Sequence, residues 1–168
     1  EYLYVGAYNN LQVDIYNIKD LTKPKLVAEI DLDGFAEGID VQNGIMYVAT
    51  GIHSRNEVAK AWDYGRGTGN GLEIFDVTDI ENPKRLSVLK MDGQSSSADM
   101  DNWDVTVSGE YAYVSSGYNG MYMYDVSDPT APIRIAVYNA VSNIANENLS
   151  ADNLYPFDIK TEDRGYIA

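Results

Sequence analysis

The sequence contains no cysteine and only one histidine among 168 residues. A disulfide framework is therefore excluded, and a zinc site of the usual His/Cys type cannot be assembled from this chain. A Ser-His-Asp triad would have to use His53, but no Gly-x-Ser-x-Gly elbow accompanies it. Paired carboxylates for glycoside cleavage are the remaining catalytic option. We expect no catalytic residue within the chain.

Positive charge and long apolar runs are also scarce. Lys and Arg total 12 against 26 Asp and Glu, which gives a net charge of −14. Such a surface repels nucleic acid and anionic membranes. No apolar run approaches the roughly eighteen residues of a membrane helix, so we expect neither nucleic-acid binding nor direct membrane insertion. No signal-like segment opens the chain, and we expect any secretion signal to lie upstream or to have been removed.

What the sequence does contain is a repeat. Three segments align without gaps, at residues 13–24 (VDIYNIKDLTKP), 72–83 (LEIFDVTDIENP) and 121–132 (MYMYDVSDPTAP). Each one joins an alternating apolar run to an Asp or Asn and closes on a proline. A repeat of this kind indicates one supersecondary unit used several times.

Each unit divides into four short alternating runs, which predict strands A to D in chain order. In the third repeat the expected strands cover residues 103–107, 111–115, 121–126 and 133–138. Asn43-Gly44 is a strong signal for a tight hairpin between strands A and B. The Asp-x-x-x-Pro segment is expected to turn strand C into strand D. Tyrosines recur in strands B and C (Tyr111, Tyr113, Tyr122, Tyr124), where they suit a face between packed sheets.

Tandem four-stranded antiparallel units predict an all-β protein, namely a β-propeller fragment of about three blades. The expected repeats cover residues 2–34, 35–93 and 94–140, with the start of a further one at 155–168. Because propellers close with about four to eight blades, we expect an incomplete ring that is completed by further blades or by a second copy.

The third repeat, from Gly120 to Pro132 and preceded by Val107 to Val114, resembles the LVIVD-repeat family. The pattern of that family is close to Gly-Leu-x-Ile-x-Asp-Val-Ser-Asp-Pro-x-x-Pro. The resemblance implies a β-propeller of the kind carried by bacterial and archaeal surface proteins. It therefore also implies an extracellular or cell-surface location.

The long insertions are expected to share one rim of the propeller. They cover residues 52–70, 92–102 and 139–156, and binding residues concentrate on such loops. Trp62 and Tyr64 are suited to stack on a sugar ring or on a partner's side chain; alternatively, Trp62 fills a small core within its own loop. The expected contact residues are His53, Arg55, Trp62, Asp63, Tyr64, Arg66, Trp103, Tyr118 and Tyr155.

Acidic residues divide into repeated and singular ones. Asp76 and Asp125, with Asn17 at the same place in the first repeat, recur, and so do Asp104 and Asp158 near the start of strand A. These repeated residues are expected to support turns or strand pairing; alternatively, their carboxylates line a channel.

The second insertion brings together oxygen ligands of the kind that calcium prefers, namely Asp92, Asp99, Asp101 and Asn102. A solvated acidic loop is the preferred explanation of this composition, and a structural calcium ion, the one cofactor that it suggests, is the alternative. Asn148-Leu149-Ser150 is a glycosylation sequon if a eukaryote secretes the protein, and an ordinary polar tripeptide otherwise.

The sequence therefore favours a binding scaffold that is secreted or displayed on a cell surface and contacts a protein or a glycan through its loops. One alternative is a fragment of a propeller hydrolase or oxidoreductase whose catalytic residues lie in other blades. Another is a structural spacer of a surface layer.

Overall fold

The structure is a computed structural model that describes residues 1–7, 10–51, 71–90, 102–116 and 120–138, together with the backbone of two short strands at 159–160 and 166–167. All regular elements in these ranges are strands, apart from turns and one short 3-10 position. No helix within them is long and apolar enough to cross a bilayer.

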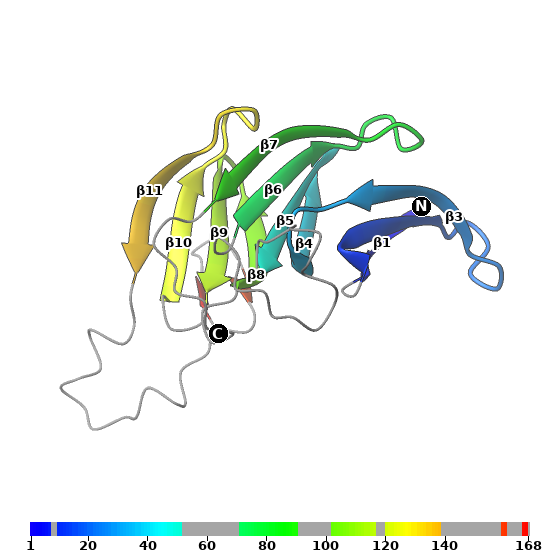
Figure 1. Ribbon diagram of the computed structural model, residues 1–168, viewed down its shortest axis with the longest axis horizontal. Coiled ribbons are helices and arrows are strands. Elements are labelled where there is room, and N and C mark those ends of the chain that lie inside the picture. Colours follow the sequence, from blue (N-terminus) through cyan, green and yellow to red (C-terminus); the bar gives the residue numbers. More distant parts are fainter. Residues whose placement is uncertain are drawn as a thin grey trace, which may run out of the picture.

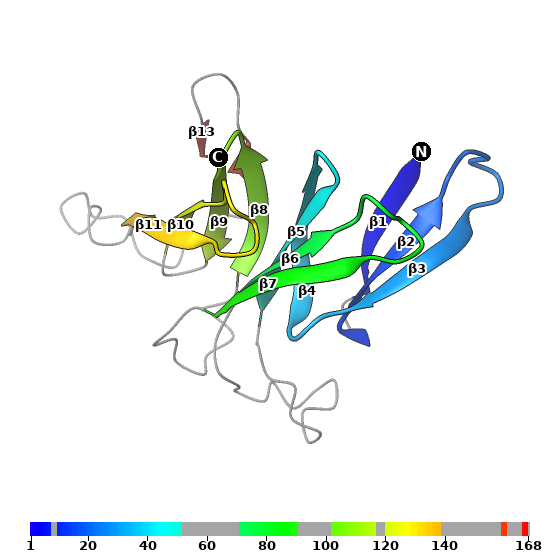
Figure 2. The same cartoon turned by 90° about the horizontal axis from the view of Figure 1, so that it is seen from above.

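The strands form three larger antiparallel sheets, which are successive blades of a propeller arc (Figures 1 and 2). Blade 1 contains β1 (Tyr2–Ala7), β2 (Gln12–Asn17) and β3 (Lys25–Asp31). Blade 2 contains β4 (Phe35–Gln42), β5 (Ile45–Gly51), β6 (Gly71–Asp76) and β7 (Lys84–Lys90). Blade 3 contains β8 (Asn102–Ser108), β9 (Tyr111–Ser116), β10 (Gly120–Asp125) and β11 (Ile133–Tyr138). In each blade, strands that are consecutive in sequence are neighbours in the sheet.

The expected repeat of strands is confirmed. In blade 3 every strand lies within one residue of its expected bounds. Asn43 and Gly44 both have positive φ, at 52° and 79°, as the tight turn between β4 and β5 requires. Two further short strands, β12 (Ile159–Lys160) and β13 (Tyr166–Ile167), pair with each other, and β12 contacts β8 and β9. Both strands lie within residues 155–168, where the start of a further repeat is expected.

The blades pack face to face, as Figure 2 shows, and each interface has its own core. Strand alternation sends one set of β5 side chains to each neighbour: Met46 and Val48 pack with blade 1, whereas Tyr47 and Ala49 pack with blade 3. Tyr122 and Tyr124 are buried between blades 2 and 3, as expected of inter-sheet tyrosines. Tyr111 is 42% exposed on the other face of blade 3.

The innermost strands of blades 2 and 3, β4 and β8, contact each other directly. Asp40 Oδ2 accepts hydrogen bonds from the backbone N–H of Val107 at 2.6 Å and from Gln42 Nε2 at 3.2 Å. Gln42 Nε2 also donates to the carbonyl of Val107. The inner strands are therefore joined by polar contacts beside the apolar core.

In each blade, a side-chain oxygen stabilises the turn between the two outer strands. It accepts a hydrogen bond from the backbone N–H of the residue two positions later in the sequence. Asp76 Oδ1 accepts from Thr78 N at 2.9 Å, and Asp125 Oδ1 accepts from Ser127 N at 2.9 Å. In blade 1, Asn17 Oδ1 accepts from Lys19 N at 3.0 Å. These contacts confirm the expected turn role of the three repeated residues.

Through Asp76 and Asp125, the stability of the fold is expected to depend on pH. Hydrogen bonds from the Thr78 and Ser127 side chains, and then from their backbone N–H groups, lower the pKa of Asp76 and Asp125 below its usual value. A lowered pKa in the folded state stabilises the fold above the unfolded value of about 3.9 and ceases to do so as pH falls through the folded value. We expect the midpoint of thermal unfolding, followed from pH 6 to pH 2.5, to fall as the pH drops below about 4.

The matched control for this acid effect is the double variant Asp76→Asn/Asp125→Asn. Asparagine keeps the accepting oxygen, as Asn17 does, but it does not titrate. The double variant should lose less stability in acid than the parent. An identical acid profile would contradict the assignment.

Candidate functional site

The strand register places the ends that flank the long insertions on one rim. In blade 2, Thr50 at the end of β5 is paired with Gly71, and Gly71 is paired with Lys90. In blade 3, Ser116 is paired with both Asn102 and Gly120. Within the part of the chain that the structure describes, the connections on the opposite rim are short turns, such as those at residues 43–44 and 109–110. We name the rim that carries the ends of the long insertions the loop rim.

Asn102 joins the two blades at the loop rim. Its side chain is fully buried, and Nδ2 donates to the carbonyls of Gly71 at 2.8 Å and Thr50 at 3.3 Å. This corrects its assignment to the second insertion, because Asn102 is the first residue of β8. The amide nitrogen thus bridges strands of blade 2, a structural role that the acidic composition around it concealed.

The other suggested calcium ligands, Asp92, Asp99 and Asp101, lie outside the described residues. Among the side chains that are described, no three of the His, Cys, Asp and Glu types gather closely enough to hold a metal ion. The calcium suggestion therefore stays a prediction.

Of the expected contact residues, the structure describes Trp103, which follows Asn102 in β8 and is half-buried with its indole nitrogen covered. The remaining ones lie outside the described residues: His53, Arg55, Trp62, Asp63, Tyr64, Arg66, Tyr118 and Tyr155. The repeated Asp158 and the sequon at Asn148 lie outside them as well.

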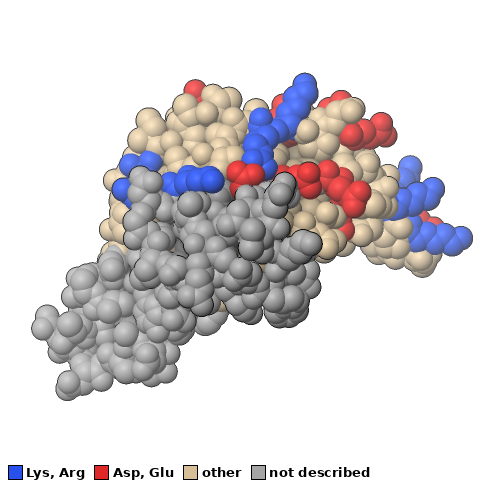
Figure 3. Space-filling view, viewed as in Figure 1, with Lys and Arg blue, Asp and Glu red and all other residues tan. Residues whose placement is uncertain are grey.

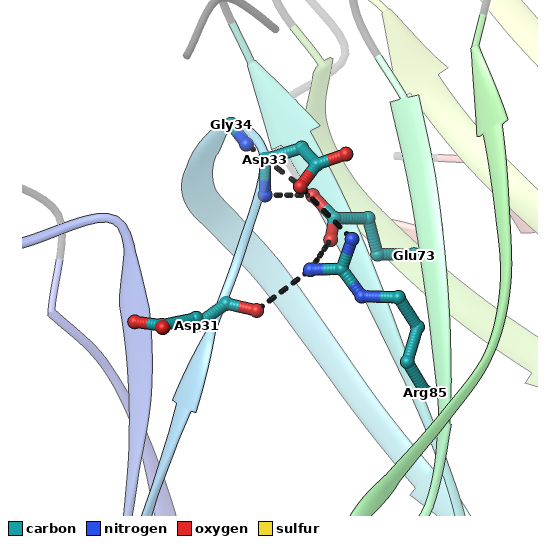
Figure 4. Close-up of polar contacts among 5 residues, drawn as sticks. All are labelled: Asp31, Asp33, Gly34, Glu73 and Arg85. Atoms are coloured by element: carbon teal, nitrogen blue, oxygen red, sulfur yellow. Dashed lines mark hydrogen bonds and ion pairs between the residues drawn. The ribbon is translucent and has the colours of Figure 1, made fainter. Parts of the chain in front are cut away.

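A buried carboxylate fastens blade 2 to the connection that precedes it (Figure 4). Glu73, in the middle of β6, is fully buried. Its Oε1 accepts hydrogen bonds from the backbone N–H groups of Asp33 at 2.8 Å and Gly34 at 3.3 Å, in the connection between β3 and β4. Its Oε2 lies 3.0 Å from Arg85 Nη2.

Arg85, on β7, completes this inter-blade clamp, which consists of Glu73, Arg85, Asp33 and the Asp31 carbonyl. Its guanidinium donates to Asp33 Oδ1 at 2.9 Å and to the carbonyl of Asp31 at 2.7 Å. The same group lies over the Phe75 ring, 5.3 Å from its centroid. The clamp therefore fixes the β3–β4 connection at the loop rim with charge-assisted hydrogen bonds.

The clamp was not predicted from the sequence. The position of Glu73 is occupied by Asp14 in blade 1 and by Tyr122 in blade 3, by the strand register. Glu73 was therefore a singular residue, and its neighbours Leu72 and Ile74 place it within an apolar strand. A carboxylate in such a run needs a buried partner, and that signal was present in the sequence.

The described positive charge is distributed along the outer strands and their turns (Figure 3). It comes from Lys19, Lys23, Lys25, Lys84, Arg85, Lys90 and Arg134. On the face that Figure 3 shows, these side chains do not form one continuous basic patch. Acidic side chains lie between some of them in this view.

The comparison with protein families supports the repeat. Residues 101–140 match the LVIVD repeat. The match covers blade 3 from the start of β8 to the end of β11. Blade 2 has the same strand order and the same Asp-supported turn as this LVIVD repeat, although it lies outside the matched residues. No curated protein matches the chain. The chain is thus a propeller-like scaffold that contains an LVIVD repeat.

Proposed function

We propose that this chain is a non-catalytic extracellular scaffold that binds a partner, a protein or a glycan, through the connections on its loop rim. The carrying observation is that the strands joined to the three insertions, β5, β6, β7, β8 and β11, all begin or end at this rim. Rigid sheets that hold long connections on one side are a common arrangement for recognition.

Two structural contacts support the proposal. Asn102 joins blades 2 and 3 at the loop rim, and the inter-blade clamp joins blades 1 and 2 there. Because the blades are joined at this rim, the strand ends that carry the connections are held in place, and this reduces the entropy cost of ordering them when a partner binds. The aromatic and charged residues of segment 52–70, above all Trp62 and Tyr64, are the proposed contacts.

The register suggests a direct test. Thr50 and Gly71 are paired neighbours, so segment 52–70 can be replaced by a short Gly-Asn-Gly link without separating β5 from β6. The parent and the shortened chain would be applied to an oligosaccharide array and to an array of extracellular protein domains. We expect at least one ligand whose affinity falls more than tenfold in the shortened chain, with little change in its unfolding midpoint.

The matched control carries Leu21→Ser on the opposite rim, where Leu21 is 75% exposed. This variant should keep the affinity of the parent. The proposal fails if no ligand binds on either array, or if a ligand is lost by the Leu21 variant and kept by the shortened chain.

A further inference from the structure

A cavity of about 200 Å³ lies between blades 2 and 3 on the rim opposite the loop rim. Its walls come from the ends of β4 and β8, from β5, and from the turns that follow β4, β8 and β10. Both blades have all four of their strands within the described residues. Because sites for whole small molecules usually measure about 300–1,000 Å³, this volume suits a single side chain of a partner.

One part of the cavity wall is apolar. It consists of Ile45, Val107, Val126 and Pro129, together with Tyr47, which is only 5% exposed. The aliphatic stem of a long cationic side chain can lie along such a wall while its charged end stays at the surface. An aromatic wall favours a guanidinium in particular, because that group is planar and stacks on rings.

The polar part of the wall offers hydrogen-bond acceptors and a negative charge. Glu110, in the turn between β8 and β9, is exposed and is the one charged residue among the described residues that line the cavity. Gln42 uses Nε2 to donate to Asp40 Oδ2 and to the carbonyl of Val107, which leaves its Oε1 as an acceptor. The lining therefore suits a ligand that donates several hydrogen bonds.

A second negative charge lies close behind this wall. Asp40 is bonded to Gln42 and to the backbone N–H of Val107, both of which line the cavity. Burial, and then the charge of Asp40, raise the pKa of Tyr47 above its usual value, so the field of this carboxylate reaches the cavity wall. Two carboxylates near one hollow favour a cation there.

Glu110 is a singular residue in the repeated turn. Its carbonyl accepts from Val126 N at 2.8 Å, just as the carbonyl of Gly44 accepts from Val77 N at 2.8 Å. Gly44 therefore has the same place in blade 2, and the turn forms there without a carboxylate. A single carboxylate beside apolar walls suits an organic cation better than a metal ion such as calcium, which takes several oxygen ligands.

We propose that this cavity binds the side chain of an arginine from a protein partner. The guanidinium donates to the Glu110 carboxylate and to Gln42 Oε1, and the aliphatic stem lies along Val107 and Val126. Arginine fits these acceptors because its planar fork of N–H donors can bond a carboxylate and a carboxamide oxygen together. This contact is separate from the loop rim and does not rest on the function proposed there.

The test uses the whole chain, labelled with nitrogen-15, and the peptide acetyl-Gly-Arg-Gly-amide, with binding followed through the amide signals of Gly109 and Glu110. A control peptide carries citrulline, which has the shape of arginine without its charge. The arginine peptide should shift both signals in a saturable way. The citrulline peptide should bind about fivefold more weakly, the factor that an ion pair at an exposed carboxylate contributes at most.

Two variants locate the contact. Glu110→Gln should weaken binding of the arginine peptide by the same factor of about five. Glu81→Gln is the matched control, because it removes the same charge from the exposed turn between β6 and β7, outside the cavity lining. This control should bind the arginine peptide as the parent does.

The proposal is overturned if the arginine peptide moves neither signal, if the citrulline peptide binds equally well, or if Glu81→Gln weakens binding as much as Glu110→Gln. The chain shortened at residues 52–70 should bind the arginine peptide like the parent. Loss of binding in that chain would place the contact on the loop rim and would also overturn the proposal. Since the shortened chain keeps the cavity, failure of this proposal is distinguishable from failure of the proposed function.

Discussion

Gly38→Ala is expected to separate blades 2 and 3. A Cβ at Gly38 would lie 2.5 Å from the Cα of Asp104 and 2.8 Å from the backbone nitrogen of Val105. Both are backbone atoms of β8, so the clash cannot be relieved by rotating a side chain. We expect a loss of about 3 kcal/mol, at the upper end of the cost of overpacking, and a fall in the unfolding midpoint of roughly 10 °C.

Tryptophan emission gives a second measurement at the same interface. In a Trp62→Phe background the remaining indole is Trp103, beside Asp104 in β8, and its emission should shift to the red if β8 moves away from β4. Gly109→Asn is the matched control, because an added Cβ there meets nothing within 4 Å and asparagine tolerates its φ of 60°. An unchanged midpoint for Gly38→Ala would refute the close approach.

The sequence predicted the blades because their signals are local. Alternation, the Asn43-Gly44 turn and the Asp-supported turns each lie within a few residues, and their repetition reinforces each single reading. The rim that carries the insertions followed from strand order alone. These features could be predicted without knowing which blades contact each other.

The contacts between blades were not predictable in the same way. Nothing in the sequence distinguishes Gly38 from other strand glycines, because its close contact is with β8 of the next blade. Glu73 accepts hydrogen bonds from N–H groups that are 39 and 40 residues away in sequence. Asn102 was taken for a loop ligand because the acidic residues before it conceal a strand start. The residues that make these contacts are not repeated at the same place in the other segments, so repetition gives no help in finding them.

Arg85→Met is expected to weaken the contact between blades 1 and 2 severely. Methionine keeps an apolar chain over Phe75 but leaves the fully buried Glu73 carboxylate without the guanidinium now 3.0 Å away. Removing one partner of a buried ion pair costs about 3–5 kcal/mol. Chemical denaturation should show a loss of this size, with the first blade exposed to proteolysis at lower denaturant than the other two.

The double variant Glu73→Gln/Arg85→Met separates loss of the pair from loss of packing. Glutamine still offers an oxygen to the N–H groups of Asp33 and Gly34, and no charge remains to be buried. We therefore expect the double variant to be more stable than Arg85→Met alone, which a merely additive effect would contradict. Arg134→Met is the control in blade 3. Arg134 lies over the ring of Tyr122, 5.9 Å from its centroid, and Tyr122 has the position that Glu73 has in blade 2. Because no buried carboxylate loses its partner, this substitution should cost no more than about 1 kcal/mol.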